Sequence, residues 1–335
     1  MALYFCADGG GTKLLMLAFD EKLRLLGGVR GTGVSTLTAD AGQVQENIRA
    51  PVRSLIDMLP PQLRGSGPLR VEKLYQTSCG AMGPAAVSEK VLDIGETVSI
   101  GEGPCGVLAG LAADTGVLTL SGTGSDCFYV QKGQRIDAVG GFGPILGDEG
   151  SGYDMGQRTL QAAIRADDGR GPASLLRDYV FEDYGLKQRM WELVDIVHGS
   201  DNYRRPVARA TYTLARAAKD GDAVAQDILR QAGRVLASDT AALLYRVGQG
   251  TECTLPVTVS GGSWKIHPLL WQTYARCLRE AYPRLQISAP HFEPVMAGVI
   301  RCILDTEGTV SPERLAQLKE NFSPYVLDQY FTEAD

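Results

Sequence analysis

This 335-residue chain has few histidines, no net positive charge and no CxxC cysteine pair. There are only three histidines, and no two of the seven cysteines form a CxxC pair, so neither a zinc site nor a disulfide framework is expected. The net charge of −6 argues against a surface that binds nucleic acid or an anionic membrane. Any bound phosphate must therefore be held mainly by backbone amides, a metal ion and a few side chains.

Long apolar segments are also missing. No signal peptide precedes the apolar run at 3–7, and no run is long enough to span a bilayer. Together with the scattered cysteines, this predicts a cytoplasmic protein. The length, with 44% hydrophobic and 21% charged residues, predicts two globular domains.

Glycine is abundant, and the 40 glycines cluster in a few turns. Three segments stand out: 8–13 (DGGGTK), 121–126 (SGTGSD) and 140–152 (GGFGPILGDEGSG). Glycine lets backbone amides approach a small polar ligand. The third segment comes just before an expected helix, whose N-terminus can also face such a ligand. Together the segments predict an enzyme that handles phosphate.

Short apolar runs predict strands in two similar series, each interrupted by a glycine turn. The first series covers 3–7, 14–19, 25–30, 73–77 and 97–100, and the second covers 117–120, 127–130, 135–139 and 256–260. This repetition indicates a duplication into two similar α/β units. The expected helices cover 38–59, 105–112, 205–219, 222–247, 295–305 and 312–331, and the chain is mostly helical after Gly150. Ser151, three residues before Asp154, and Asp222 are the expected N-caps of two helices.

The first glycine turn lies between two strand-like runs, with neither the P-loop nor the dinucleotide-binding spacing. Its amides and the Thr12 hydroxyl would face phosphates, and Asp8 would hold Mg²⁺ through water. The alternative is a plain hairpin with a permissive turn. In the second turn, Thr123 and Ser125 can donate hydrogen bonds, while Asp126 would bind a hydroxylated substrate or cap the turn.

The three segments, in this order and spacing, resemble the N-acetylglucosamine kinase branch of the sugar kinase/Hsp70/actin superfamily, which is grouped with the BadF/BadG/BcrA/BcrD-type ATPases. The resemblance covers most of the chain and is weakest over 167–254. It implies an α/β fold with two ribonuclease-H-like domains facing each other across a nucleotide cleft. The expected domains are 1–113, with a C-terminal helix at about 315–335 packing back on it, and 114–314, with a helical insertion at about 151–250.

The resemblance implies an ATP- and Mg²⁺-dependent sugar kinase and assigns its contacts. Residues 260–263 would form the adenosine-side turn, or else an ordinary strand-to-helix connection. The expected ATP contacts are Gly9, Gly10, Gly11, Thr12, Lys13, Gly122, Thr123, Gly124, Gly261, Gly262 and Ser263. The expected sugar contacts are Ser125, Asp126, Gly141, Phe142, Asp148, Ser35 and Thr36. Phe142 stands where the related kinases often have Trp.

The catalytic base departs from the family pattern. The family carries Asp in an Asn-Asp-Ala context, whereas residues 99–104 read SIGEGP here. Glu102 is the only carboxylate in that stretch, so it is the expected base, with a surface residue at the start of a helix as the alternative. Glu149 is expected to act only as a favourable charge before a helix N-terminus.

The acceptor side also departs from the pattern. Residues 33–37 lack the asparagine amide that the related kinases offer, and residues 79–82 lack the expected polar side chains. A site without these partners discriminates less, so the expected hexosamine-like acceptor need not be N-acetylglucosamine itself, and a related amino sugar, a larger sugar derivative or a different hydroxyl compound stays open. A nucleotide-dependent switch, a sugar sensor and a partner-activating ATPase stay open as alternative functions. A homodimer stays open as the oligomeric state. Cys79 and Cys127 are expected to be buried thiols rather than cluster ligands.

Overall fold

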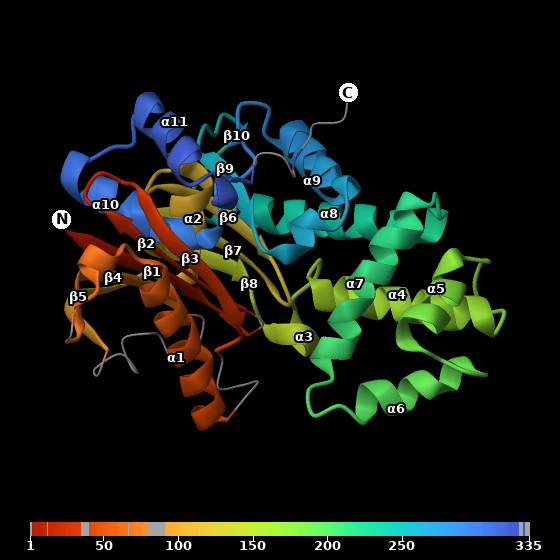
Figure 1. Ribbon diagram of the computed structural model, residues 1–335. Coiled ribbons are helices and arrows are strands. Elements are labelled where there is room, and N and C mark those ends of the chain that lie inside the picture. Colours follow the sequence, from red (N-terminus) through yellow and green to blue (C-terminus); the bar gives the residue numbers. More distant parts are fainter. Residues whose placement is uncertain are drawn as a thin grey trace. The chain divides into compact units, whose positions relative to one another are not determined.

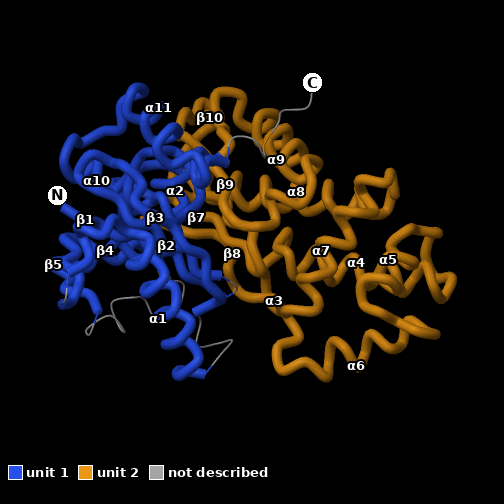
Figure 2. Tube along the Cα trace, in the orientation of Figure 1, with its two compact units in different colours: residues 1–116, 130–135, 290–328 blue, residues 117–129, 136–289, 329–335 orange. Residues whose placement is uncertain are grey.

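The computed structural model describes residues 2–11, 13–34, 40–65, 67–78, 91–327 and 331. The chain divides into two compact units (Figure 2). Unit 1 comprises residues 1–116, 130–135 and 290–328, and unit 2 comprises residues 117–129, 136–289 and 329–335. The domain limits expected from the sequence, 113/114 and 314, stay a prediction.

Unit 1 contains a five-stranded sheet in the order β3-β2-β1-β4-β5 (Figure 1). The first three strands are antiparallel neighbours, and β4 and β5 extend the sheet in parallel to β1. The strands are β1 (Leu3–Gly9), β2 (Lys13–Asp20), β3 (Leu25–Thr32), β4 (Leu69–Ser78) and β5 (Leu92–Ser99). The helices are α1 (Ala41–Met58), η1 (Pro61–Leu63), α2 (Glu102–Leu111), η5 (Pro294–Met296), α10 (Ala297–Glu307), α11 (Pro312–Asn321) and η6 (Ser323–Tyr325).

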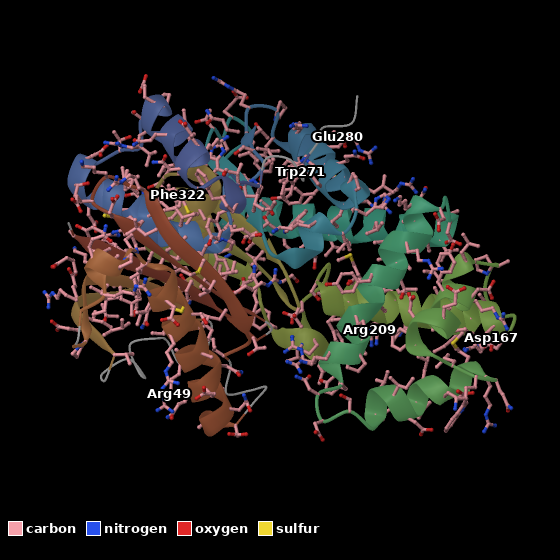
Figure 3. The ribbon with its side chains drawn as sticks, viewed as in Figure 1. Arg49, Asp167, Arg209, Trp271, Glu280 and Phe322 are labelled. Atoms are coloured by element: carbon pink, nitrogen blue, oxygen red, sulfur yellow. The ribbon has the colours of Figure 1, made fainter. Side chains whose placement is uncertain are left out.

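Each face of this sheet has its own apolar core. Side chains alternate along a strand, so Phe5 of β1 packs in the core that contains Leu55 of α1, whereas Cys6 packs in the core formed by α2, α10 and α11. Phe322, labelled in Figure 3, belongs to this second core and lies edge-on to Phe19, with ring centroids 6.3 Å apart. The same alternation places Asp8, two residues after Cys6, on the α2 and α10 side.

Unit 2 contains a second five-stranded sheet in the order β10-β9-β6-β7-β8. Its strands are β6 (Gly116–Ser121), β7 (Ser125–Gln131), β8 (Gln134–Gly140), β9 (Pro256–Ser260) and β10 (Gln286–Ile287). Taken from β8, this is the strand order of unit 1, with the fourth strand again beside the first. The two similar α/β units predicted from the sequence are confirmed as two similar sheets, and the first and second glycine turns each connect the first two strands of their sheet.

Two helices of unit 2 begin at the capping residues expected from the sequence. Ser151 Oγ accepts from the Asp154 amide at 3.1 Å, and Asp222 Oδ1 accepts from the Ala225 amide at 2.8 Å. On α9 (Pro268–Ala281), Trp271 (Figure 3) stacks on Tyr274, with ring centroids 6.1 Å apart. No helix of the described part of the chain is long and apolar enough to cross a membrane. The helices are α3 (Gly143–Leu146), α4 (Gly152–Asp167), α5 (Leu175–Tyr184), η3 (Met190–Glu192), α6 (Leu193–His198), α7 (Arg204–Lys219), α8 (Ala223–Arg246), η4 (Gly262–Lys265) and α9 (Pro268–Ala281).

Candidate functional site

Four charged side chains gather at the end of β1 in unit 1. Burial raises the pKa of Asp8 to about 6, opposed by the positive charge of Lys13 and reinforced by Glu293 and Glu102. Lys13 follows the turn on the same sheet face as Asp8, by the alternation along β2. A raised carboxyl pKa beside specific charge partners is typical of a functional site.

Glu293 is a member of this group that the sequence did not indicate. Its Oε2 lies 3.4 Å from Lys13 Nζ, although 280 residues separate the two in sequence. Glu293 directly precedes η5, which leads into α10. A Cβ on Gly298 of α10 would overlap the Cys6 sulfur, so glycine allows α10 to lie directly against β1. This close packing places Glu293 beside Lys13.

Glu102 is the first residue of α2, after the N-cap Gly101, and its side chain is exposed. A carboxylate is favourable in the first turn of a helix. Its negative charge contributes to the raised pKa values of Asp8 and of the buried Cys105. Cys105 Sγ lies 3.3 Å from both Thr77 Oγ1 and the Pro294 carbonyl oxygen, which connects α2 to β4 and η5. The Glu102 charge therefore acts on Asp8 from the start of α2.

The first glycine turn is tight, and part of its backbone is already paired. The Gly10 amide donates to the Lys13 carbonyl at 2.9 Å, and the Gly10 carbonyl accepts from the Val34 amide at 2.9 Å. The Gly10 amide is thus used within the turn rather than left for a ligand. Beyond Gly10 and its two chain neighbours, no atom of the described chain lies within 4 Å of the position that a Cβ of Gly10 would take. Thr12, Ser35 and Thr36 lie outside the described residues.

In unit 2 the second and third glycine turns meet. The Gly122 carbonyl accepts from the Gly152 amide at 2.7 Å and from Ser263 Oγ at 3.1 Å, so α4 and η4 both begin at this turn. Gly261 has a φ of +109°, and a Cβ there would overlap the Ser121 carbonyl oxygen. The Cβ positions of Gly122 and Gly262 face open space among the described atoms. This exposed backbone fits a polyphosphate group.

Asp148 lies against the second glycine turn. It is 4% exposed and has a left-handed φ of +57°, which is unusual for a residue with a side chain. Its Oδ1 accepts from the Gly143 amide at 3.2 Å, and its Oδ2 accepts from Arg204 Nη2 at 3.4 Å. A Cβ on Gly124 would lie only 2.9 Å from Oδ2. Arg204, at the start of α7, was not indicated by the sequence.

The expected sugar contacts of unit 2 lie close to Asp148. A Cβ on Gly141 would overlap Asp126 Oδ2, so this carboxylate lies directly against the Gly141 backbone. Ser125 Oγ donates to the Glu149 carbonyl at 2.8 Å, which joins the start of β7 to the same loop. Phe142 is 73% exposed. The carboxylates of Asp126 and Asp148 and the Ser125 hydroxyl thus lie on one loop region that also carries the exposed ring of Phe142.

A metal ion would have few protein ligands. Within residues 2–11, 13–34, 40–65, 67–78 and 91–327, no group of three or more His, Cys, Asp or Glu side chains could hold one. Asp8 is a half-buried carboxylate beside the first glycine turn. Mg²⁺ usually takes one or two carboxylates, waters and substrate phosphates, so this sparse donor set fits Mg²⁺ better than a cage-bound metal.

The sequence profile of the BadF/BadG/BcrA/BcrD ATPase family matches residues 7–300, which include all the groups described above. The chain belongs to the BadF/BadG/BcrA/BcrD ATPase family. It is 25% identical over 308 residues to the N-acetylmuramic acid/N-acetylglucosamine kinase of Clostridium acetobutylicum, covering 88% of this chain and 95% of that protein. It is also 25% identical over 186 residues to the N-acetyl-D-glucosamine kinase of Dictyostelium discoideum, covering 55% and 58%.

Solved structures share the fold of this BadF/BadG/BcrA/BcrD ATPase family member. A protein from Chromobacterium violaceum, proposed to be an N-acetylglucosamine kinase, superposes with a TM-score of 0.65 at 20% identity, covering 90% of this chain and 98% of that one. A ROK family glucokinase from Streptomyces griseus, solved with glucose and AMPPNP, gives 0.53 at 16% identity, with coverage of 89% and 97%. These likenesses support a two-unit, actin-like ATPase fold.

Proposed function

We propose that this protein transfers the γ-phosphoryl group of ATP to a hydroxyl of a hexosamine-like sugar, in a Mg²⁺-dependent reaction. The observation that carries the proposal is the meeting of Asp8, Lys13 and Glu102 beside the first glycine turn. Two carboxylates and an ammonium group beside a glycine turn suit phosphoryl transfer, because this reaction depends on positioning and charge neutralisation. The names of the two relatives support a sugar as the acceptor.

In unit 1 each of the four charged residues has one proposed role. Asp8 would hold Mg²⁺ through water, and its carboxyl must be ionised to do so. Lys13 favours that ionised form and offers a positive charge to phosphate oxygens. The exposed Glu102 carboxylate would accept or orient the proton of the attacking hydroxyl. Glu293 holds the Lys13 ammonium in position through their ion pair.

In unit 2 the backbone would do most of the nucleotide binding. The open backbone at Gly122 and Gly262 would receive phosphate and adenosine groups, with Thr123, Gly124, Gly261 and Ser263 completing the two turns. ATP would supply the phosphoryl group, and Mg²⁺ would neutralise its charge. Asp148 would accept hydrogen bonds from the sugar, and Ser125, Asp126, Gly141 and the exposed Phe142 would line the acceptor side.

The proposal is tested by the release of ADP from Mg-ATP, with neutral hexoses, hexosamines, N-acetylated sugars and muramyl sugars offered in turn. We expect one sugar class to stimulate turnover, and Glu102→Gln to abolish the stimulation while ATP binding is retained. Tight ATP binding without stimulation by any sugar would instead favour the nucleotide-dependent switch.

A further inference from the structure

The guanidinium of Arg204 has more binding capacity than its one ion pair uses. Its Nη2 lies 3.4 Å from Asp148 Oδ2, whereas charge-assisted hydrogen bonds are usually 2.7–2.9 Å long. The Arg204 side chain is 36% exposed, against 5% for that of Asp148. Arg204 therefore neutralises the buried Asp148 carboxylate through Nη2, and its other guanidinium N–H groups are not used in this ion pair.

A second observation points to a missing acceptor. Arg204 Nε is buried and has no hydrogen-bond partner among the described residues. A buried donor without a partner costs free energy comparable to a lost hydrogen bond, and more when the group is charged. A carboxylate can accept from Nε and a neighbouring Nη at once, because its two oxygens match the spacing of the guanidinium fork.

The surroundings of Arg204 suit a sugar ring. The positive charge of Arg204 acts on the Tyr153 phenol, where it opposes the burial that raises the pKa of Tyr153. Tyr153 lies edge-on to Tyr203, with centroids 6.1 Å apart, and Tyr203 is 41% exposed. The exposed ring of Tyr203, held by the buried Tyr153, offers an apolar face close to a carboxylate and a guanidinium, as carbohydrate binding requires.

We propose that Arg204 binds a carboxylate carried by the acceptor, so that the protein prefers sugars with an acidic substituent, such as a hydroxy-acid ether, over their neutral parents. This inference rests on the proposed function, because it assumes that Asp148 binds the acceptor. It goes further by naming the substituent and the residue that selects it. Without Arg204, the carboxylates of Asp126 and Asp148 would repel an acidic sugar.

N-acetylmuramic acid and N-acetylglucosamine form a matched pair of probes, because the first is the second with a lactyl ether added. We expect the wild-type kcat/KM to be higher for N-acetylmuramic acid. In Arg204→Gln, the ratio of the two kcat/KM values should fall about 10- to 100-fold, as expected for the loss of a charge-assisted contact. Arg204→Lys should give an intermediate ratio, because it keeps the charge and loses the fork.

Arg205→Gln is the matched control, because Arg205 is the exposed neighbour on the same helix turn. It should leave the ratio unchanged. The ratio of the two kcat/KM values does not depend on how much of the protein is folded, so a general loss of folded protein does not change it. An equal loss on both sugars in Arg204→Gln would overturn the inference and assign Arg204 to the transferred phosphoryl group or to the support of Asp148. A wild-type preference for the neutral sugar would also overturn it.

Calorimetric binding of the two sugars separates failure of this inference from failure of the proposed function. If neither sugar is phosphorylated, the kinase proposal fails. Tighter binding of N-acetylmuramic acid that is lost in Arg204→Gln would still uphold the carboxylate site. Equal binding of both sugars, or no binding, would reject it.

Discussion

Replacing Asp8 by asparagine should make the protein more stable while removing its activity. Burial raises the pKa of Asp8 from 3.8 to about 6, so the folded state disfavours the ionised carboxylate that the unfolded chain carries freely. This displacement corresponds to about 3 kcal/mol. The cost is fully present above pH 6, falls as the pH drops through this value and is absent below about pH 4.

Asparagine carries no charge, so Asp8→Asn should be more stable than the wild type by up to about 3 kcal/mol at pH 7.5. The difference should shrink below about 1 kcal/mol near pH 4. The assay is urea unfolding at both pH values, with EDTA and without nucleotide. Asp57→Asn, at an exposed carboxylate of α1, is the control and should change stability by less than about 0.5 kcal/mol.

A variant that is less stable than the wild type at pH 7.5, or a difference that does not depend on pH, would refute this reasoning. Either result would mean that Asp8 is well solvated or is stabilised as an anion in the folded chain. The expected result would show that the chain keeps a destabilising carboxylate beside its first glycine turn, as a functional role requires.

Three further predictions concern residues around the two glycine-turn groups. Glu102→Gln should lower sugar phosphorylation about 10²- to 10⁴-fold and leave ATP affinity, measured by calorimetry, nearly unchanged; full activity would place the base elsewhere. Lys13→Met should move the acidic limb of the kcat/KM profile to higher pH and Glu293→Gln should move it to lower pH, because their charges act on Asp8 in opposite directions; shifts in the same direction would disprove this coupling. Gly261→Ala should destabilise unit 2 by at least about 1–3 kcal/mol in thermal unfolding, since the new methyl group overlaps the Ser121 carbonyl and φ is +109°. Gly262→Ala is its control, and equal stability of the two variants would contradict the geometry.

Local sequence patterns predicted most of the fold. Short apolar runs bounded by glycine predicted the strands around the first and second glycine turns. Capping side chains predicted the helix starts at Ser151 and Asp222. The fold class and family were therefore accessible from the sequence. Residues 167–200 carry no comparable signal, and the sequence set no limits for α5 and α6 within this mostly helical region.

The missed site residues depend on packing between distant segments. Glu293 reaches Lys13 only because Gly298 lets α10 lie against β1, and no local pattern marks residue 293. Arg204 contacts Asp148 across 56 residues, at the start of a helix whose apolar stripe gave the stronger signal. The pairing of the Gly10 amide with the Lys13 carbonyl also needed coordinates, because the sequence shows that a turn exists but not which of its amides are occupied.

The most direct test of the central claim follows the γ-phosphoryl group itself. The protein is incubated with Mg²⁺, γ-labelled ATP and either N-acetylmuramic acid or N-acetylglucosamine, and the label is traced by chromatography and mass spectrometry. The account predicts label on a sugar hydroxyl in the wild type and none in Asp8→Asn. Label released only as inorganic phosphate, at a rate independent of any sugar, would contradict it.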